Sequence, residues 1–383
     1  MRPTTIPLHL AVALDGAGWH PAAWREPDAD PAGLFGASYW LRLVTEAQRG
    51  LLDFVTFDDS LGVQSTRPDG PDERTDRVRG RLDAHLIAAR VAPLTSNIGL
   101  VPTVTVTHTE PFHTSKAIAS LDYVSTGRAG WQVRVSARDY EAAQFGRREI
   151  PARAELFDEA ADYVEVVRRL WDSWEDDAVI RDVAGGRFVD TARLHYIGFS
   201  GKWFSVKGPS ITPRPPQGQP LVTLLAHGPL PYRLAARAAD LVYVTPRDAS
   251  QAAAIVAEIR AEQENEAPLH VFGDLVVFLD TTERAAHDRK ARLDDRAGEE
   301  YRSDARIFTG TPAQLADLLV DWNAGGLTGF RLRPAALPHD LTAIVDGLVP
   351  ELHARGRFRR EYEASTLRGL LGLSRPANRY ATT

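Results

Sequence analysis

The stretch IGLVPTVTVTHTEPFHTSKAIASLDYVSTGRAGWQVRV, residues 98–135, decides the fold of this chain. Its beginning, Ile98–Val106, is rich in β-branched residues and predicts a strand, whereas Pro111–Ser125 has the length and apolar spacing of a helix. A second apolar run, Ala129–Val135, predicts another strand. Because parallel strands need a crossover of roughly a dozen residues or more, usually a helix, the stretch predicts a β-α-β unit. Such units build parallel sheets that carry helices on their faces.

The same alternation of strand and helix runs through the rest of the chain. We expect eight strands, at Ile6–Leu14, Phe54–Phe57, Ile98–Val106, Ala129–Val135, Leu221–Leu225, Leu241–Val244, Leu269–Leu279 and Gly329–Leu332. The expected helices lie at Ser38–Gly50, Asp83–Ala92, Pro111–Ser125, Pro151–Ser173, Pro231–Ala239, Ala252–Glu264, Thr311–Ala324 and His339–Ala354. No Gly-rich dinucleotide-binding fingerprint follows the first strand, so the pattern favours a closed (β/α)8 barrel over an open sheet. The predicted fold class is therefore α/β, a TIM-like barrel.

Two stretches interrupt this alternation. Residues Glu175–Gln219 contain Gly, Pro, Asp and aromatic residues with weak periodicity, and we expect them to form the largest insertion, after the fourth strand. The charged segment Glu283–Ile307 predicts a solvated helix and loop near the seventh strand. Excursions of this kind usually build a lid or a contact between subunits. We therefore expect residues 1–383 to form a single barrel domain with an insertion at about 175–219.

Composition limits the chemistry and the partners of the chain. The net charge is −6 with interspersed acidic and basic residues, so the sequence does not predict nucleic-acid binding. The absence of cysteine excludes disulfides, thiolate metal ligands and a cysteine nucleophile, and we expect no metal site. The short apolar start is interrupted at Asp15, which favours a first strand over a signal or membrane segment. We expect a cytoplasmic protein whose chemistry uses oxygen, nitrogen or a cofactor.

Several blocks, in order and at fixed spacing, carry a resemblance to a known family. They are LVTEAQRGLLDFVTFDDSL (43–61), EPFHTSKAIASLDYVSTGRAGWQV (110–133), RLWDSWEDDAV (169–179), GKWFSVKGPSITPRPPQGQP (201–220) and LVPELHARGRFRREYEASTLRGLLGLSRP (348–376). With these blocks the chain resembles the bacterial-luciferase-like flavin-dependent monooxygenases, in the branch of the nitrilotriacetate and dibenzothiophene-sulfone monooxygenases. The resemblance implies a TIM-like barrel and a homodimer or homotetramer. It also implies oxidation of a small organic substrate by O₂ and reduced FMN, which a separate NAD(P)H-flavin reductase supplies.

The resemblance also implies a set of site residues at the carboxyl ends of the strands. Flavin contacts are expected from the side chains of Asp59, Thr103, Thr105 and Gln132 and from the backbone amides of His227 and Gly228. His108 is the candidate catalytic residue because of its position, just beyond the exit of the third strand. From the residues alone, other interpretations stay open. Asp59 suits a helix N-cap, the threonines suit an ordinary strand face, and His108 suits a hydrogen-bonded loop position.

The chain departs from the family pattern at several flavin contacts. Ile150 and Ala154 stand where the family has His and Tyr, and Gly228 stands where the family has Ser. Arg134 lies at the end of the fourth strand, where the family has small residues, and it is expected to bind an anion or to pair with an acid such as Asp59. Each lost charge-assisted hydrogen bond removes about 1.5–3 kcal/mol, so we expect reduced FMN to be weakly bound.

These departures leave two alternatives to a flavin monooxygenase. One is a deazaflavin-dependent oxidoreductase on the same fold, which would transfer hydride without oxygen. The other is a catalytically reduced partner subunit with weak or no flavin binding.

Overall fold

Eight parallel strands form the centre of the computed structural model, which describes residues 7–65, 67, 69–264 and 267–381. They are β1 (His9–Leu14), β2 (Phe54–Phe57), β3 (Gly99–Thr105), β4 (Gly130–Arg134), β9 (Leu221–Leu225), β10 (Leu241–Val244), β11 (His270–Leu279) and β13 (Gly329–Pro334). Each strand pairs with the next in this order, and the pairing of β13 with β1 closes the ring. The predicted barrel is confirmed. Ile6, at the start of the first expected strand, lies outside the described residues.

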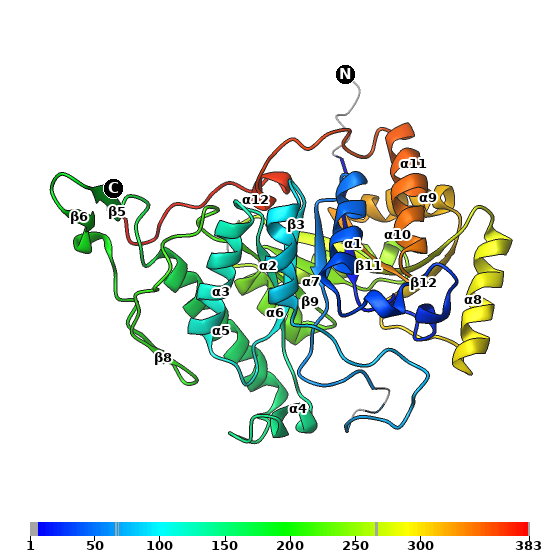
Figure 1. Cartoon of the computed structure of the whole chain (residues 1–383), viewed down its shortest axis with the longest axis horizontal. Coiled ribbons are helices and arrows are strands. Elements are labelled where there is room, and N and C mark those ends of the chain that lie inside the picture. The colour runs from blue at the N-terminus through cyan, green and yellow to red at the C-terminus, as the bar shows by residue number, and fades with distance from the viewer. Residues whose placement is uncertain (1–6, 66, 68, 265–266, 382–383) are drawn as a thin grey trace.

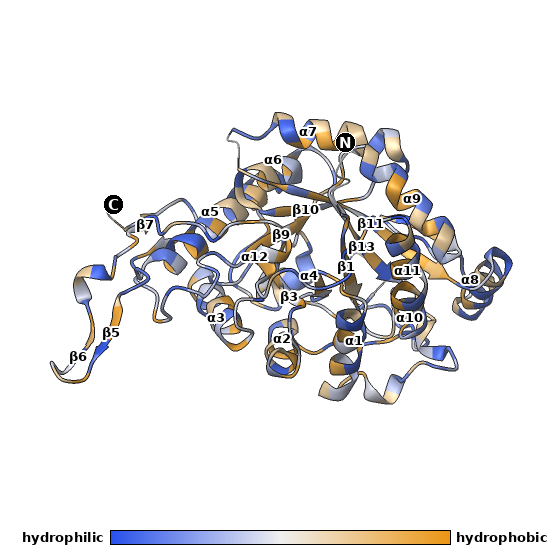
Figure 2. Ribbon diagram, turned by 90° about the horizontal axis from the view of Figure 1, so that it is seen from above, coloured by the Kyte–Doolittle hydropathy of each residue, from blue (hydrophilic) through white to orange (hydrophobic). Residues whose placement is uncertain are grey.

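Helices surround the strands on all sides (Figure 2). They are α1 (Ala37–Arg49), α2 (Ala84–Val91), α3 (Pro111–Val124), α5 (Arg153–Asp172), α6 (Pro229–Ala238), α7 (Ala249–Ala261), α9 (Pro312–Ala324), α10 (His339–Ala343) and α11 (Val349–Ala354). All eight expected helices are found. The last differs in detail, because a π-helical turn at Ile344–Leu348 separates α10 from α11 where one continuous helix was predicted.

A ninth parallel strand, absent from the sequence prediction, lies at the barrel mouth. The charged segment contains the expected helix, α8 (Glu283–Ala297), and then β12 (Arg306–Gly310). β12 pairs with Leu275–Leu279 of β11, which β13 contacts over 272–277, so β12 lies on the other edge of β11. The strand is short and begins with an exposed arginine, so it lacks the apolar run by which the barrel strands were found.

The predicted insertion after the fourth strand is confirmed, and it projects from the barrel (Figure 1). It contains two small antiparallel hairpins, β5 (Val179–Asp182) with β6 (Arg187–Val189) and β7 (Phe199–Ser200) with β8 (Ser205–Val206). We predicted irregular structure here, because strands of two to four residues leave no periodicity to detect. A short helix, α4 (Asp139–Ala143), follows β4 near the mouth.

The amino-terminal end of the barrel is filled by apolar side chains. Phe54, Val101, Leu221, Leu241 and Phe272 form one buried cluster inside the ring. Leu367, from the short helix α12 (Leu367–Leu370), packs into the same cluster from the carboxy-terminal segment. Because this end is packed, a ligand can enter the barrel only from the mouth at the carboxyl ends of the strands.

Above this apolar layer the interior of the barrel is polar. Alternate residues of each strand point inward, and on β11 and β13 the inward residues at this level are charged. Asp274 on β11 is fully buried and forms ion pairs with two arginines on β13, with nitrogen-to-oxygen distances from 2.5 to 3.0 Å. Arg331 donates to both carboxylate oxygens, whereas Arg333 donates through two nitrogens to Oδ2 alone. Burial alone would lower the pKa of Arg333, but the charges of Asp274 and Asp304 outweigh this effect and raise it. The two guanidinium groups are buried at the base of the mouth with Asp274 as their shared counter-ion.

Replacing Asp274 by Asn should therefore destabilise the barrel strongly. Removing one partner of a buried ion pair costs about 3–5 kcal/mol, and here the change leaves two buried cations without their shared counter-ion. We expect a loss of that size in the free energy of unfolding, measured by urea denaturation. Asp288→Asn, at an exposed position on α8, serves as the control and should change it by about 0.5 kcal/mol or less. A loss below about 1 kcal/mol for Asp274→Asn would contradict the ion-pair account.

Candidate functional site

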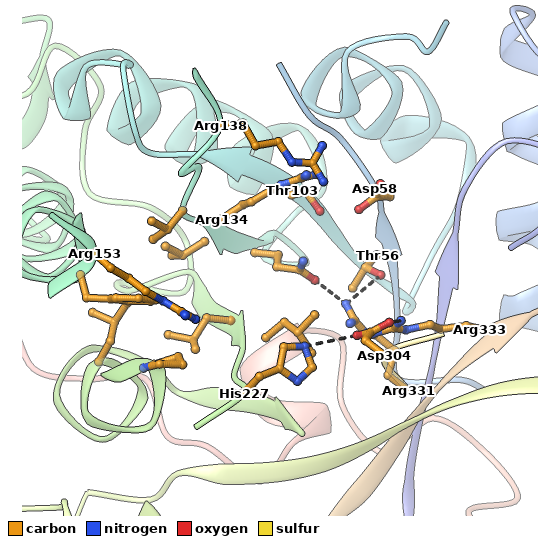
Figure 3. Close-up of a pocket in the computed structure, with 18 of the residues that line it drawn as sticks. Thr56, Asp58, Thr103, Arg134, Arg138, Arg153, His227, Asp304, Arg331 and Arg333 are labelled. Carbon is orange, nitrogen blue, oxygen red and sulfur yellow. Dashed lines mark hydrogen bonds and ion pairs between the residues drawn. The ribbon is translucent and has the colours of Figure 1, made fainter. Parts of the chain in front are cut away.

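A cavity of about 490 Å³ opens at the carboxyl ends of the barrel strands. Ligand and cofactor sites typically measure about 300–1,000 Å³, so the space suits a small molecule or a cofactor. Its lining comes from most barrel strands and from the starts of α5 and α6, and consists of Trp19, Thr56, Asp58, Thr103, Gln132, Val133, Arg134, Val135, Arg138, Arg153, Phe157, Leu224, Leu225, His227, Pro231, Leu234, Asp304, Arg331 and Arg333. Figure 3 shows the polar members of this set around the opening.

Arg331 organises the floor of the cavity. Its guanidinium donates to the Oε1 atom of Gln132, lies 3.5 Å from Thr56 Oγ1, and has its Cζ atom 3.6 Å from the centroid of the Tyr243 ring. Burial raises the pKa of Tyr243, and the charge of Asp274 adds to this. The charge of Arg331 lowers the pKa by less, so the phenol stays protonated. Gln132 therefore presents its Nε2 group as the amide atom left to donate to a ligand.

One wall is an ion-paired chain that ends at the mouth. Arg333 pairs with Asp304 at 2.7 Å, and Asp304 lies 3.2 Å from Nε2 of His227. Burial would raise the pKa of Asp304, but the hydrogen bonds to His227 and Arg333 outweigh it and lower the pKa. The Trp19 ring lies 4.7 Å from the Arg333 guanidinium carbon. Asp304 is thus held as a carboxylate beside the cavity (Figure 3).

Part of the cavity lining is apolar, and the Thr103 hydroxyl in the lining has no hydrogen-bond partner among the described residues. The side chains of Val133, Val135, Leu224, Leu225, Phe157 and Leu234 provide surface on which a planar ring can pack. Thr103 lines the cavity from β3, where it is paired in register with Gln132, and its buried Oγ1 has no hydrogen-bond partner among the described residues. Because a buried polar group without a partner costs about 1–3 kcal/mol, this hydroxyl marks a position where a ligand atom would be stabilised.

Three further arginines surround the opening: Arg134, Arg138 and Arg153. Arg134 ends β4, Arg138 precedes α4, and Arg153 is the first residue of α5. Figure 3 shows Arg153 reaching into the cavity from α5. The sequence prediction that Arg134 pairs with Asp59 is only half met, because Arg134 donates to the backbone oxygen of Asp59 and not to its carboxylate.

The structure brings together some of the predicted flavin contacts and separates others. Thr103, Gln132 and His227 line the cavity. The Asp59 carboxylate instead accepts from the backbone amides of Ser60 at 2.7 Å and Ala84 at 3.0 Å, so it caps the start of α2 while its neighbour Asp58 faces the cavity. Thr105 is buried farther along β3, paired in register with Arg134.

Two positions in loops behave differently from the sequence expectation. Gly228 has φ +99° and ψ −176°, a backbone conformation that only glycine adopts readily, which explains why the family serine is missing there. His108, also at a positive φ of 71°, stacks on Phe145 with ring centroids 5.4 Å apart, outside the cavity lining. Burial and the nearby Arg148 lower its pKa, so the imidazole is neutral near pH 7.

The start of α5 shows how the chain departs from the family pattern. Arg153 and Phe157, one helical turn apart, line the cavity, whereas Ile150 precedes the helix and Ala154 is exposed. A cation therefore stands next to the position where the resemblance implies a phosphate contact. The unpaired Thr103 hydroxyl, the Gln132 amide, the apolar wall and this cation fit the ring and phosphate of FMN.

Several residues of the site were not singled out from the sequence. Arg331 and Arg333 alternate with Phe330 and Leu332 in an otherwise buried strand. Two arginines on one face of a buried strand indicate a buried acidic partner, because a buried charge requires an opposite charge or hydrogen bonds. This pattern in the sequence would have pointed to the polar layer. The partner, Asp274, lies within a continuous apolar run, and Asp304 belongs to a segment predicted as solvated.

The described part of the chain contains neither a cluster of metal ligands nor a membrane-spanning helix. Within residues 7–65, 67, 69–264 and 267–381 no group of three or more His, Cys, Asp or Glu side chains is placed to hold a metal ion. Among the helices of those residues, none is long and apolar enough to cross a membrane.

Comparisons with known proteins agree with this geometry. A family model described as luciferase-like monooxygenase matches residues 18–317. The chain is 31% identical to N-acetyl-S-(2-succino)cysteine monooxygenase of Bacillus subtilis (strain 168), with 98% of both chains covered. It is also 31% identical to nitrilotriacetate monooxygenase component A of Aminobacter aminovorans, again over 98% of each chain. Among solved structures, a riboflavin lyase with modified FMN and riboflavin superimposes with a TM-score of 0.86 at 25% identity, covering 97% of both chains.

Beside the cavity, two carboxylates share one guanidinium. Arg81 lies 3.1 Å from Asp15, at the end of β1, and 3.1 Å from Asp58. Burial raises the pKa of Asp15 to about 6, the charge of Arg81 opposes this, and the neighbouring Asp58 adds to it. The folded protein therefore holds a proton on Asp15 that the unfolded chain releases near pH 4.

This arrangement predicts a pH-dependent contribution to stability. The contribution is fully present below about pH 4 and is lost as the pH rises through about 6, because the folded state then has to release the proton. The difference in unfolding free energy between wild type and Asp15→Asn should change by about 2–3 kcal/mol between pH 4 and pH 7, in favour of the variant at the higher pH. Urea denaturation at several pH values measures it. The exposed Asp321→Asn should show a constant difference, and a constant difference for Asp15→Asn would refute the assignment.

Proposed function

The chain belongs to the luciferase-like monooxygenase family, and we propose that it is the oxygenating component of a two-component system, oxidising a small organic substrate with O₂ and reduced FMN. The single observation that carries the proposal is the cavity at the barrel mouth, which is partly apolar and which Thr103 lines with a buried hydroxyl that has no partner among the described residues. The name of one relative, a component A, supports the view that a separate reductase supplies the reduced flavin.

In this proposal, different lining residues contact the ring and the phosphate of the flavin. Thr103 Oγ1 and the Gln132 amide would hydrogen-bond the polar edge of the ring system, and the apolar side chains of Leu224 and Val133 would contact its face. Arg153, which lines the cavity, and the backbone of the adjacent His227–Gly228 turn would hold the phosphate. Reduced FMN, when bound, supplies the electrons that activate O₂.

Asp274, Arg331 and the apolar lining residues set the shape and polarity of the cavity. The ion pairs of Asp274 fix Arg331, which in turn orients the Gln132 amide. The apolar part of the lining would limit the access of water to the cavity when flavin is bound, which protects reactive species from hydrolysis. We assign no proton transfer to His108, because its ring stacks on Phe145 outside the lining.

Assembly of the chain with copies of itself stays a prediction from the resemblance. The β5–β6 hairpin carries exposed apolar side chains, Val183 at 93% and Phe188 at 66% exposure, which suits a contact surface.

The proposal predicts how flavin binding depends on Arg153. Anaerobic titration of the purified protein with reduced FMN should show saturable binding, and oxidised FMN should bind more weakly. Arg153→Gln should weaken FMN by roughly tenfold to a hundredfold, the value of one charge-assisted contact, and leave riboflavin unchanged because riboflavin has no phosphate. Arg284→Gln, which removes an exposed charge on α8, is the matched control. Absence of reduced-FMN binding by the wild type would refute the proposed function, and equal loss of FMN and riboflavin would refute the role of Arg153.

A further inference from the structure

The charges around the cavity are balanced on the side of β13 and unbalanced on the side of β4 and α5. On the β13 side, Arg331 and Arg333 face Asp274 and Asp304, two cations with two anions. On the other side, Arg134, Arg138 and Arg153 line the cavity, and the further carboxylate in the lining is Asp58. Asp58 already pairs with Arg81 at 3.1 Å. This side of the cavity therefore has an excess of positive charge.

Arg134 is the clearest case of an unpaired cation. It is partly buried at the end of β4, and among the described residues no carboxylate lies within ion-pair distance of it. Its Nη1 atom donates to the backbone oxygen of Asp59, which fixes the side chain without neutralising it. A guanidinium has five N–H donors, so most of its donors remain available beside the cavity.

Arg138, four residues farther along the chain, differs from Arg134 in having a carboxylate partner. Its Nη1 atom donates to the Tyr140 hydroxyl at 2.9 Å and forms an ion pair with the buried Glu141 at 3.6 Å, which leaves its other N–H donors available. Figure 3 shows Arg134 and Arg138 on the same side of the cavity, near Thr103, whereas Arg153 reaches in from α5. Both guanidinium groups line the same cavity, so each attracts an anion that enters it.

We propose that Arg134 and Arg138 bind the carboxylate of the substrate, and that the substrate is a small organic acid bound as its anion. The inference rests on the proposed function, in which Arg153 and the His227–Gly228 turn serve the flavin phosphate. The planar fork of a guanidinium matches the two oxygens of a carboxylate, which gives orientation as well as attraction. The arginine pair thereby selects organic acids over neutral substrates of the same shape.

The anion that these arginines attract has two sources, a substrate carboxylate or the FMN phosphate, and calorimetric titration distinguishes them. Succinate and tricarballylate are titrated into the protein with and without saturating FMN, and each acid is compared with its methyl ester. We expect the acids to bind in both conditions, and the esters to bind at least about tenfold more weakly, because they lack the charge.

Variants assign the effect to the arginines. Arg134→Gln and Arg138→Gln should each weaken the acids by roughly tenfold to a hundredfold while leaving the esters and FMN unchanged. Arg134→Lys should retain part of the affinity, because it keeps the charge but loses the fork. Arg284→Gln controls for removal of one positive charge from the surface, and thermal unfolding checks that each variant is folded.

Three results would overturn this inference: esters that bind as well as acids, folded Gln variants that keep full affinity for the acids, or acids that FMN displaces. The last would mean that these arginines serve the flavin phosphate. A wild-type protein that binds the acids but no reduced flavin would instead sink the proposed function and leave the carboxylate site standing.

Discussion

The buried carboxylate of Asp274 is the interaction on which the interior of this barrel depends. It holds two guanidinium groups from one neighbouring strand at distances of 2.5 to 3.0 Å, inside a ring of strands. A barrel strand bearing Arg331 and Arg333 on its inner face would be unfavourable without that counter-ion. With it, Arg331 can reach Gln132 and the Tyr243 ring, and Arg333 can reach Asp304 at the mouth.

The polar layer of Asp274, Arg331 and Arg333 separates the packed amino-terminal end of the barrel from the cavity at its carboxyl end. Toward the amino-terminal ends of the strands, Phe54 and Phe272 pack with Leu367 of the carboxy-terminal segment and close the barrel. Toward the carboxyl ends, the same alternation of inward residues leads to Thr103, Gln132 and the cavity. The same layer of side chains therefore stabilises the barrel and positions the residues of the site. A substitution of Asp274 would affect both the stability of the fold and the geometry of the cavity.

Sequence reasoning predicted the barrel well, because long apolar strands and amphipathic helices leave a periodic signal. β2, β9 and β10 begin and end at the predicted residues, whereas β12 was missed because five residues with a charged start carry no such signal. The site was only partly predictable. Strand alternation placed Thr103 correctly, but it could not tell which of two adjacent acids, Asp58 or Asp59, turns toward the cavity.

A crystal structure of the protein grown anaerobically with reduced FMN tests the position of the flavin most directly. We expect the ring of the flavin against Thr103 and Gln132, its phosphate beside Arg153, and open space between the ring and Arg134 for a substrate. A phosphate seated on Arg134 and Arg138, or a flavin bound outside the barrel mouth, would contradict it.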